Sequence, residues 1–153
     1  MHITRNIHVA ALLPLLAFAA CTTPAAPTNS LQGTWRLISG TTIEKNDTVT
    51  TDYTAGKSFI KIINGSHFAF TGHDLVKGKD SANAFFTSGA GTYTLIDGNY
   101  TEKLEYCTGR AWEGNEFKFN ITIANDTLVQ QGVEKVEAAG VDRINIERYV
   151  RVN

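Results

Sequence analysis

Apolar and polar residues alternate along most of the chain from Leu31 onward, which is the pattern of half-buried β-strands. The pattern is clearest in 116–124, where polar positions separate four apolar ones, at Phe117, Phe119, Ile121 and Ile123. Similar patterns predict eight further strands, at 33–40, 57–63, 66–71, 84–87, 92–96, 100–106, 127–131 and 143–152. No segment in this part of the sequence shows a long helical period.

Short segments rich in Gly and Asn lie between the predicted strands. Asn64-Gly65 and Asp97-Gly98 favour two-residue hairpins of type I′, in which both central residues need positive φ. Gly89-Ala90-Gly91 is interpreted as a further turn. Residues 41–56 are polar and rich in Thr, which indicates a long loop or a poor edge strand.

About nine short sequential strands with tight turns predict an all-β fold, either an antiparallel up-and-down β-barrel of about eight to nine strands or a sandwich. A barrel removes exposed edges by pairing its first strand with its last. The strand pattern begins and ends strongly, so we favour the closed barrel. Residues 31–153 are long enough to form one such domain with an apolar core.

The first 20 residues have a different pattern. Arg5 and the terminal amine precede the apolar stretch 9–20, which ends in small residues. This arrangement predicts a secretory signal peptide, and the stretch is shorter than the roughly 20 residues of a transmembrane helix. Residues 22–30 contain mainly Thr, Pro and Ala, which predicts a flexible tether.

The junction Leu15-Leu16-Ala17-Phe18-Ala19-Ala20-Cys21 resembles a bacterial lipobox. The resemblance implies a lipoprotein signal peptide at 1–20 and acyl chains on Cys21 that anchor the protein to a membrane, each buried CH₂ contributing about 0.8 kcal/mol. The alternative is an ordinary signal cut near Ala20. Thr22 is not the Asp that retains many bacterial lipoproteins in the inner membrane, which favours the outer membrane of the cell envelope.

Charge and motifs exclude several classes of function. Only Arg5 of the 14 Lys and Arg lies in the signal, so 13 basic residues face 15 acidic ones after cleavage, a net charge of −2. This balance argues against nucleic-acid binding. No nucleophile triad, phosphate loop or paired-carboxylate motif is visible, so we expect neither enzyme activity nor a cofactor or metal. An enzyme that uses the barrel as its cavity remains a third hypothesis.

Gly33-x-Trp35 at the first predicted strand resembles the opening of lipocalins and other calycins. The chain from 31 to 152 is similar to a lipocalin-like family of unknown function in secreted and lipid-anchored bacterial proteins. The resemblance also depends on segments 66–70, 89–93, 100–102 and 147–151. It implies a barrel, an Arg of the last strand stacked on Trp35, and a tendency to bind small molecules.

One face of the predicted strand 100–106 carries Tyr100, Glu102, Leu104 and Tyr106. We expect this face to line the barrel interior. An ionised carboxylate needs a partner there, and we expect Arg151 or Arg148 to pair with Glu102. The pair would either fix the strand register beneath Trp35 or bind the polar end of a ligand.

The leading hypothesis is a lipid-anchored binding protein whose barrel holds a small hydrophobic or amphipathic molecule. Its predicted contacts are Trp35, His67, Tyr93, Tyr100, Glu102, Tyr106 and Arg151. The alternative is a filled barrel that acts through its outer surface as a protein-interaction or inhibitor module in the envelope. A cavity lined by Glu102 would support the first hypothesis, whereas a barrel packed shut by Phe59, Phe117 and Phe119 would support the second.

Overall fold

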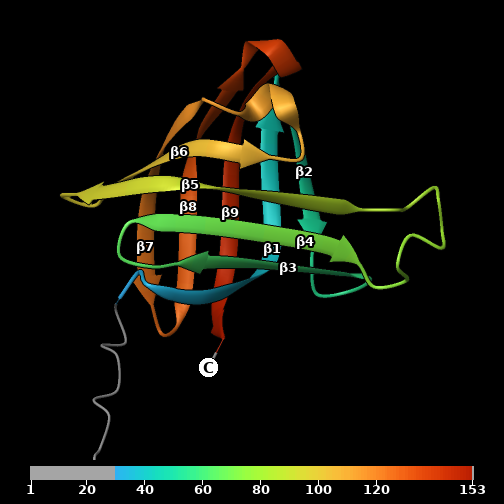
Figure 1. Ribbon diagram of the computed structural model, residues 1–153, viewed down its shortest axis with the longest axis horizontal. Helices are drawn as coiled ribbons and strands as arrows, with labels where there is room; N and C mark the ends of the chain where they lie inside the picture. Colours follow the sequence, from blue (N-terminus) through green and yellow to red (C-terminus); the bar gives the residue numbers. More distant parts are fainter. Residues whose placement is uncertain (1–29, 153) are drawn as a thin grey trace, which may run out of the picture.

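In a computed structural model, which describes residues 30–152, nine strands form one antiparallel sheet (Figure 1). The strands are β1 (Gly33–Glu44), β2 (Asp47–Asp52), β3 (Lys57–Ile63), β4 (His67–Asp74), β5 (Phe86–Ile96), β6 (Asn99–Cys107), β7 (Glu116–Ala124), β8 (Thr127–Val136) and β9 (Val141–Val152). Two short 3-10 helices are η1 (Arg110–Trp112) and η2 (Glu137–Ala139). Within residues 30–152 no helix is long and apolar enough to cross a membrane. The predicted signal, Cys21 and most of the tether lie outside the described residues.

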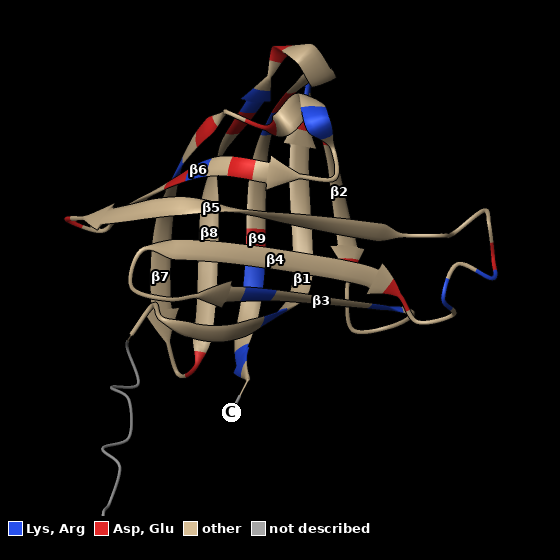
Figure 2. Cartoon of the chain, viewed as in Figure 1, with Lys and Arg blue, Asp and Glu red and all other residues tan. Residues whose placement is uncertain are grey.

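The sheet closes on itself because β1 pairs with β9 from Thr34 to Ile43. Strands β3 to β8 each pair with the next strand in the chain, and β1 pairs with both β3 and β9, so β1 and β3–β9 form a closed eight-stranded barrel. The extra strand β2 pairs with the second half of β1, while β3 pairs with the first half. The prediction of an all-β, up-and-down barrel is therefore confirmed. In the view of Figure 2 acidic and basic residues are interspersed over strands and loops.

The predicted number of strands is right, although their limits differ in two places. For residues 41–56 the edge strand is the correct alternative, since they contain the end of β1 and the whole of β2, which pairs only with β1. Conversely, the two strands predicted around Gly89 and Gly91 are the single strand β5. These glycines make room for neighbours, since a Cβ would lie 2.4 Å from the Phe70 ring at Gly89 and 1.9 Å from the Lys103 carbonyl oxygen at Gly91.

The two predicted type I′ hairpins differ in outcome. Asp97 and Gly98 have φ of 50° and 80°, as the prediction requires. Neither Asn64 nor Gly65 has positive φ, so type I′ is wrong there although β3 and β4 do form a hairpin. The side-chain oxygen of Asn64 accepts hydrogen bonds from the backbone N–H groups of Ser66 (3.0 Å) and His67 (2.8 Å), which supports a wider turn.

One end of the barrel is filled with apolar side chains, and we call it the closed end. Its buried residues are Leu31, Trp35, Leu37, Ile63, Phe68, Tyr100, Leu128 and Tyr149. They lie where β1, β4, β6 and β8 begin and where β3 and β9 end, and antiparallel pairing brings these termini together. Figure 1 shows the start of the described chain and the C-terminus at this end, and η1 and η2 at the opposite end.

Trp35 and Arg151 tie the chain start to the closed end. The Trp35 indole N–H donates to the Leu31 carbonyl at 2.8 Å, and the Arg151 guanidinium lies 4.2 Å from the centre of the Trp35 ring. Arg151 also donates to the carbonyls of Ser30 (2.6 Å) and Gln32 (3.0 Å). The stacking that the lipocalin resemblance implies is thus present, and the residues before β1 seal the barrel base.

Candidate ligand-binding cavity

The half of the barrel away from the closed end contains a cavity of about 490 Å³. This volume lies within the usual range of small-molecule sites, about 300–1,000 Å³. Its apolar wall consists of Phe59, Phe70, Leu104, Trp112, Phe117, Phe119 and Tyr149, together with the ring of Tyr53. Neighbouring rings of this wall pack against each other; the ring centres of Trp112 and Phe117, for example, are 5.8 Å apart.

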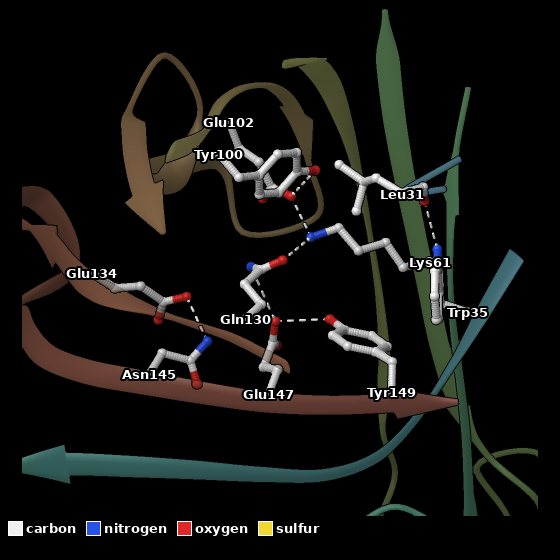
Figure 3. A network of polar contacts seen from close by, with 10 residues as sticks. All are labelled: Leu31, Trp35, Lys61, Tyr100, Glu102, Gln130, Glu134, Asn145, Glu147 and Tyr149. Atoms are coloured by element: carbon white, nitrogen blue, oxygen red, sulfur yellow. Dashed lines mark hydrogen bonds and ion pairs between the residues drawn. The ribbon is translucent and has the colours of Figure 1, made fainter. Parts of the chain in front are cut away.

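A buried ion pair between Lys61 and Glu102 forms the floor of the cavity (Figure 3). Their side chains are 3% and 8% exposed. Tyr100 donates its hydroxyl proton to Glu102 Oε1 at 2.6 Å, and Lys61 donates to Gln130 Oε1 at 2.9 Å. The ammonium and the carboxylate therefore have additional hydrogen-bond partners, which buried charges need.

The structure corrects the predicted partner of Glu102. The Arg151 guanidinium stacks on Trp35 at the barrel base and is not directed toward Glu102. Arg148 is exposed on the outside of β9. The cation is Lys61, which points inward because it shares one face of β3 with the buried residues Phe59 and Ile63. The shared face was visible in the sequence, but Ile60 and Ile62 make the opposite face equally apolar, so the pattern did not show which face is inside.

Glu147 on β9 belongs to the same polar network, to which Gln130 connects it. Its Oε2 atom accepts hydrogen bonds from the Tyr149 hydroxyl at 2.7 Å and from the Gln130 side-chain amide at 3.3 Å (Figure 3). Its Oε1 atom accepts no hydrogen bond from any residue between 30 and 152. Glu147 pairs across the strands with Gly40, which also lines the cavity and presents no side chain there.

Burial raises the pKa of the Glu147 carboxyl above its ordinary value. The positive charge of Lys61 and the hydrogen bond from Tyr149 oppose this rise, whereas the charges of Glu134 and Glu102 reinforce it. Glu147 is thus the least well compensated carboxylate of the cavity.

Glu134 on β8 is better satisfied. Arg143 contacts Glu134 Oε2 through Nη2 at 2.7 Å and through Nε at 2.8 Å, and the Asn145 amide donates to Oε1 at 2.8 Å. The Arg143 guanidinium also lies 5.5 Å from the Trp112 ring centre, close to η1. Arg143 and Glu134 thus form a second ion pair at the far end of the cavity.

Of the seven residues predicted to contact a ligand, Glu102 alone lines the cavity. Tyr100 lies next to it and fixes its carboxylate. Trp35 and Arg151 belong to the closed end. Tyr93 is half-buried; its hydroxyl donates to the Asn64 carbonyl, and its ring centre lies 5.3 Å from that of Tyr100.

The last two predicted residues point away from the interior. His67 is exposed on β4 and its ring bonds the Ser66 hydroxyl. Tyr106 is 66% exposed because a β-bulge interrupts β6, where Ala90 pairs with Tyr106 but Gly91 pairs with Leu104. The extra residue reverses the alternation, so Cys107 rather than Tyr106 lines the cavity.

Several polar residues that line the cavity were not predicted, namely Lys61, Gln130, Glu134, Arg143, Asn145 and Glu147. On β9 the inward residues Asn145 and Glu147 alternate with Ile144, which is 36% exposed. The ordinary rule, apolar inside and polar outside, assigns this part of β9 the wrong way round. Tyr149 lies on the same face as Asn145 and Glu147 and is buried, but the sequence alone does not show that this face of β9 is the inward one.

Comparison with known proteins assigns no family to the chain. No protein-family model matches it, and neither does any curated protein. Among the described residues, no three His, Cys, Asp or Glu side chains converge as metal ligands. The chemistry of the cavity therefore has to be inferred from its own geometry.

Proposed function

We propose that this protein is a lipid-anchored binding protein of the bacterial cell envelope, most simply of the outer membrane, and a lipocalin-like member of the calycins. Its barrel holds a small, partly apolar ligand. The observation that carries this proposal is the cavity of about 490 Å³, which has an aromatic wall on one side and hydrogen-bonded polar groups on the other. Such a combination of apolar walls and a few fixed polar groups is typical of small-molecule sites.

The state of the barrel core supports a binding protein over a filled interaction module. The closed end is packed, but Phe59, Phe117 and Phe119 line the cavity and leave it unfilled. A module that acts only through its outer surface has no need of such a volume, because unfilled space in a core reduces stability.

The ligand is tested by native mass spectrometry of the protein purified from the envelope of its own host. We expect a retained small molecule. Thr51 lines the cavity from β2, whereas its neighbour Thr50 is exposed. Thr51→Trp should displace the molecule and Thr50→Trp should retain it; a bare protein mass in the wild type would contradict the proposal.

The anchor is tested separately by metabolic labelling with a palmitate analogue. Labelling of the wild type and of Cys107→Ala, but not of Cys21→Ala, is the expected result. Cys107 is the matched control because it lies on β6 at the cavity. Equal labelling of the Cys21→Ala variant would contradict lipidation at this position.

A further inference from the structure

The charges that line the cavity do not balance. The lining contains two cations, Lys61 and Arg143, and three carboxylates, Glu102, Glu134 and Glu147. Lys61 is paired with Glu102, and Arg143 is paired with Glu134. Glu147 is therefore the carboxylate with no cation of its own among the described residues.

The free oxygen of Glu147 borders open space. Both of its hydrogen bonds reach Oε2, so Oε1 is available on the side of the cavity that Glu147 lines, whereas the Tyr53 ring fills the place of the missing side chain at Gly40 opposite. A partly buried carboxylate without a counter-charge is unfavourable. A cation that enters the cavity would remove this cost, whereas a second anion would add to it.

Aromatic rings line the same cavity as Glu147. Tyr53 lines the cavity. The pKa of its phenol is raised mainly by burial and also by the negative charge of Glu147, whereas the positive charge of Arg143 opposes this rise. The Tyr53 ring meets Phe59 edge to face, with centres 5.9 Å apart. Faces of aromatic rings attract ammonium groups, so these walls suit both a cationic head and an apolar body.

We propose that the ligand of the cavity is an amphipathic amine, whose protonated nitrogen pairs with Glu147 Oε1 and whose apolar body packs against Phe59, Phe70 and Phe117. The inference rests on the proposed binding function and adds the chemical class of the ligand. The bound ammonium restores charge balance in the cavity, since three carboxylates then face three cations.

Three probes with one apolar body and different heads test the inference. Isothermal titration at pH 7 compares 4-phenylbutylamine, 4-phenylbutanol and 4-phenylbutanoate, with protein purified from cells that express the full chain. We expect the amine to bind at least tenfold more tightly than the alcohol, and the carboxylate to bind most weakly. This ranking needs only the wild-type protein, so it can overturn the inference even if no variant folds.

Glu147→Gln keeps the shape and removes the charge, and circular dichroism checks its fold. We expect this variant to bind amine and alcohol within about twofold of each other, with the alcohol unaffected. Glu116→Gln, which removes an exposed carboxylate on β7, is the matched control and should keep the wild-type ranking.

The outcomes separate the ligand class from the binding function. Equal binding of alcohol and amine, or an amine preference that survives in Glu147→Gln, would overturn the inference and leave a binding cavity in place. Binding of none of the three probes would also overturn it; the envelope-purified protein then decides the function, since a retained neutral or anionic molecule supports binding of another class.

Discussion

Replacing Lys61 by Met tests whether the ion pair inside the barrel is truly desolvated. The Lys61 side chain is 3% exposed, and its ammonium contacts the Glu102 carboxylate and the Gln130 amide oxygen. It also lies 5.3 Å from the Phe68 ring centre and 5.4 Å from that of Tyr100. Met fills a similar volume but leaves a buried carboxylate without its cation.

The expected loss is a large part of the stability of the domain. Removing one partner of a buried ion pair costs about 3–5 kcal/mol, and the orphaned acceptor on Gln130 adds about 1 kcal/mol. We therefore expect Lys61→Met to lower the free energy of unfolding by about 4–6 kcal/mol, against a total of about 5–15 kcal/mol for a typical domain. The melting temperature should fall by more than about 10 °C.

A double-mutant cycle identifies the cause. In the Lys61→Met/Glu102→Gln variant both charges of this ion pair are removed, and Tyr100 can still donate to the amide oxygen at 102, while Glu147 keeps its charge and loses the nearby ammonium of Lys61. We expect the double variant to recover at least half of the loss, as measured by urea unfolding with linear extrapolation. The exposed ion pair of Lys135 and Asp142, 3.7 Å apart, is the control, and Lys135→Met should cost less than about 1 kcal/mol.

Two results would refute the reasoning. A loss below about 1 kcal/mol in Lys61→Met would mean that water in the cavity solvates Glu102 well enough to replace the cation. A double variant that is no more stable than Lys61→Met would mean that packing, not charge, determines the effect.

Five further substitutions test other parts of the structure by urea unfolding. Arg151→Met should cost about 2 kcal/mol because it removes two hydrogen bonds from a charged donor to the chain start, and a neutral effect would contradict the sealed base. Tyr106→Ser should change stability by less than about 0.5 kcal/mol while Tyr100→Phe costs about 1–2 kcal/mol, and the reverse order would place the β6 bulge elsewhere. Gly91→Ala should cost more than about 2 kcal/mol, since its Cβ would lie 1.9 Å from a carbonyl oxygen of β6, and a tolerated Ala would disprove this close approach. Glu147→Gln should gain stability over the wild type as pH rises above about 4.5, because the folded carboxyl has the higher pKa and the wild type loses stability on deprotonation; a difference independent of pH would show that the pKa of Glu147 is not raised in the fold.

Period-two alternation predicted the strands well where one face is apolar. The limits of β3 and β7 match the predicted segments 57–63 and 116–124 at both ends. The closure of first strand on last also followed from the sequence, because an unpaired edge at either end would be unfavourable. These features depend on local pattern and on a general property of sheets.

The polar interior was not predictable in the same way. Along β9 both faces carry apolar and polar residues, so alternation gives the period but not which face is inside. The bulge in β6 changes which residues point inward after Leu104, and it lies where Gly91 on β5 closely approaches the β6 backbone, a contact between strands that the local pattern of β6 does not show. Which inward residues of non-adjacent strands meet, such as Lys61 on β3 and Glu102 on β6, depends on the tilt and stagger of the barrel.

The start of the described chain is attached to the closed end of the barrel, so the two ends of the barrel differ in what they can contact. Arg151 holds the carbonyls of Ser30 and Gln32 at the base, whereas Trp112 and η1 lie beside the cavity at the other end (Figure 1). Whatever is attached through the residues before Ser30 is therefore joined to the base and not to the end that holds the cavity. If the protein is anchored through Cys21, as we propose, its point of attachment and its cavity lie at opposite ends of the barrel, so the anchor does not have to move for a ligand to enter.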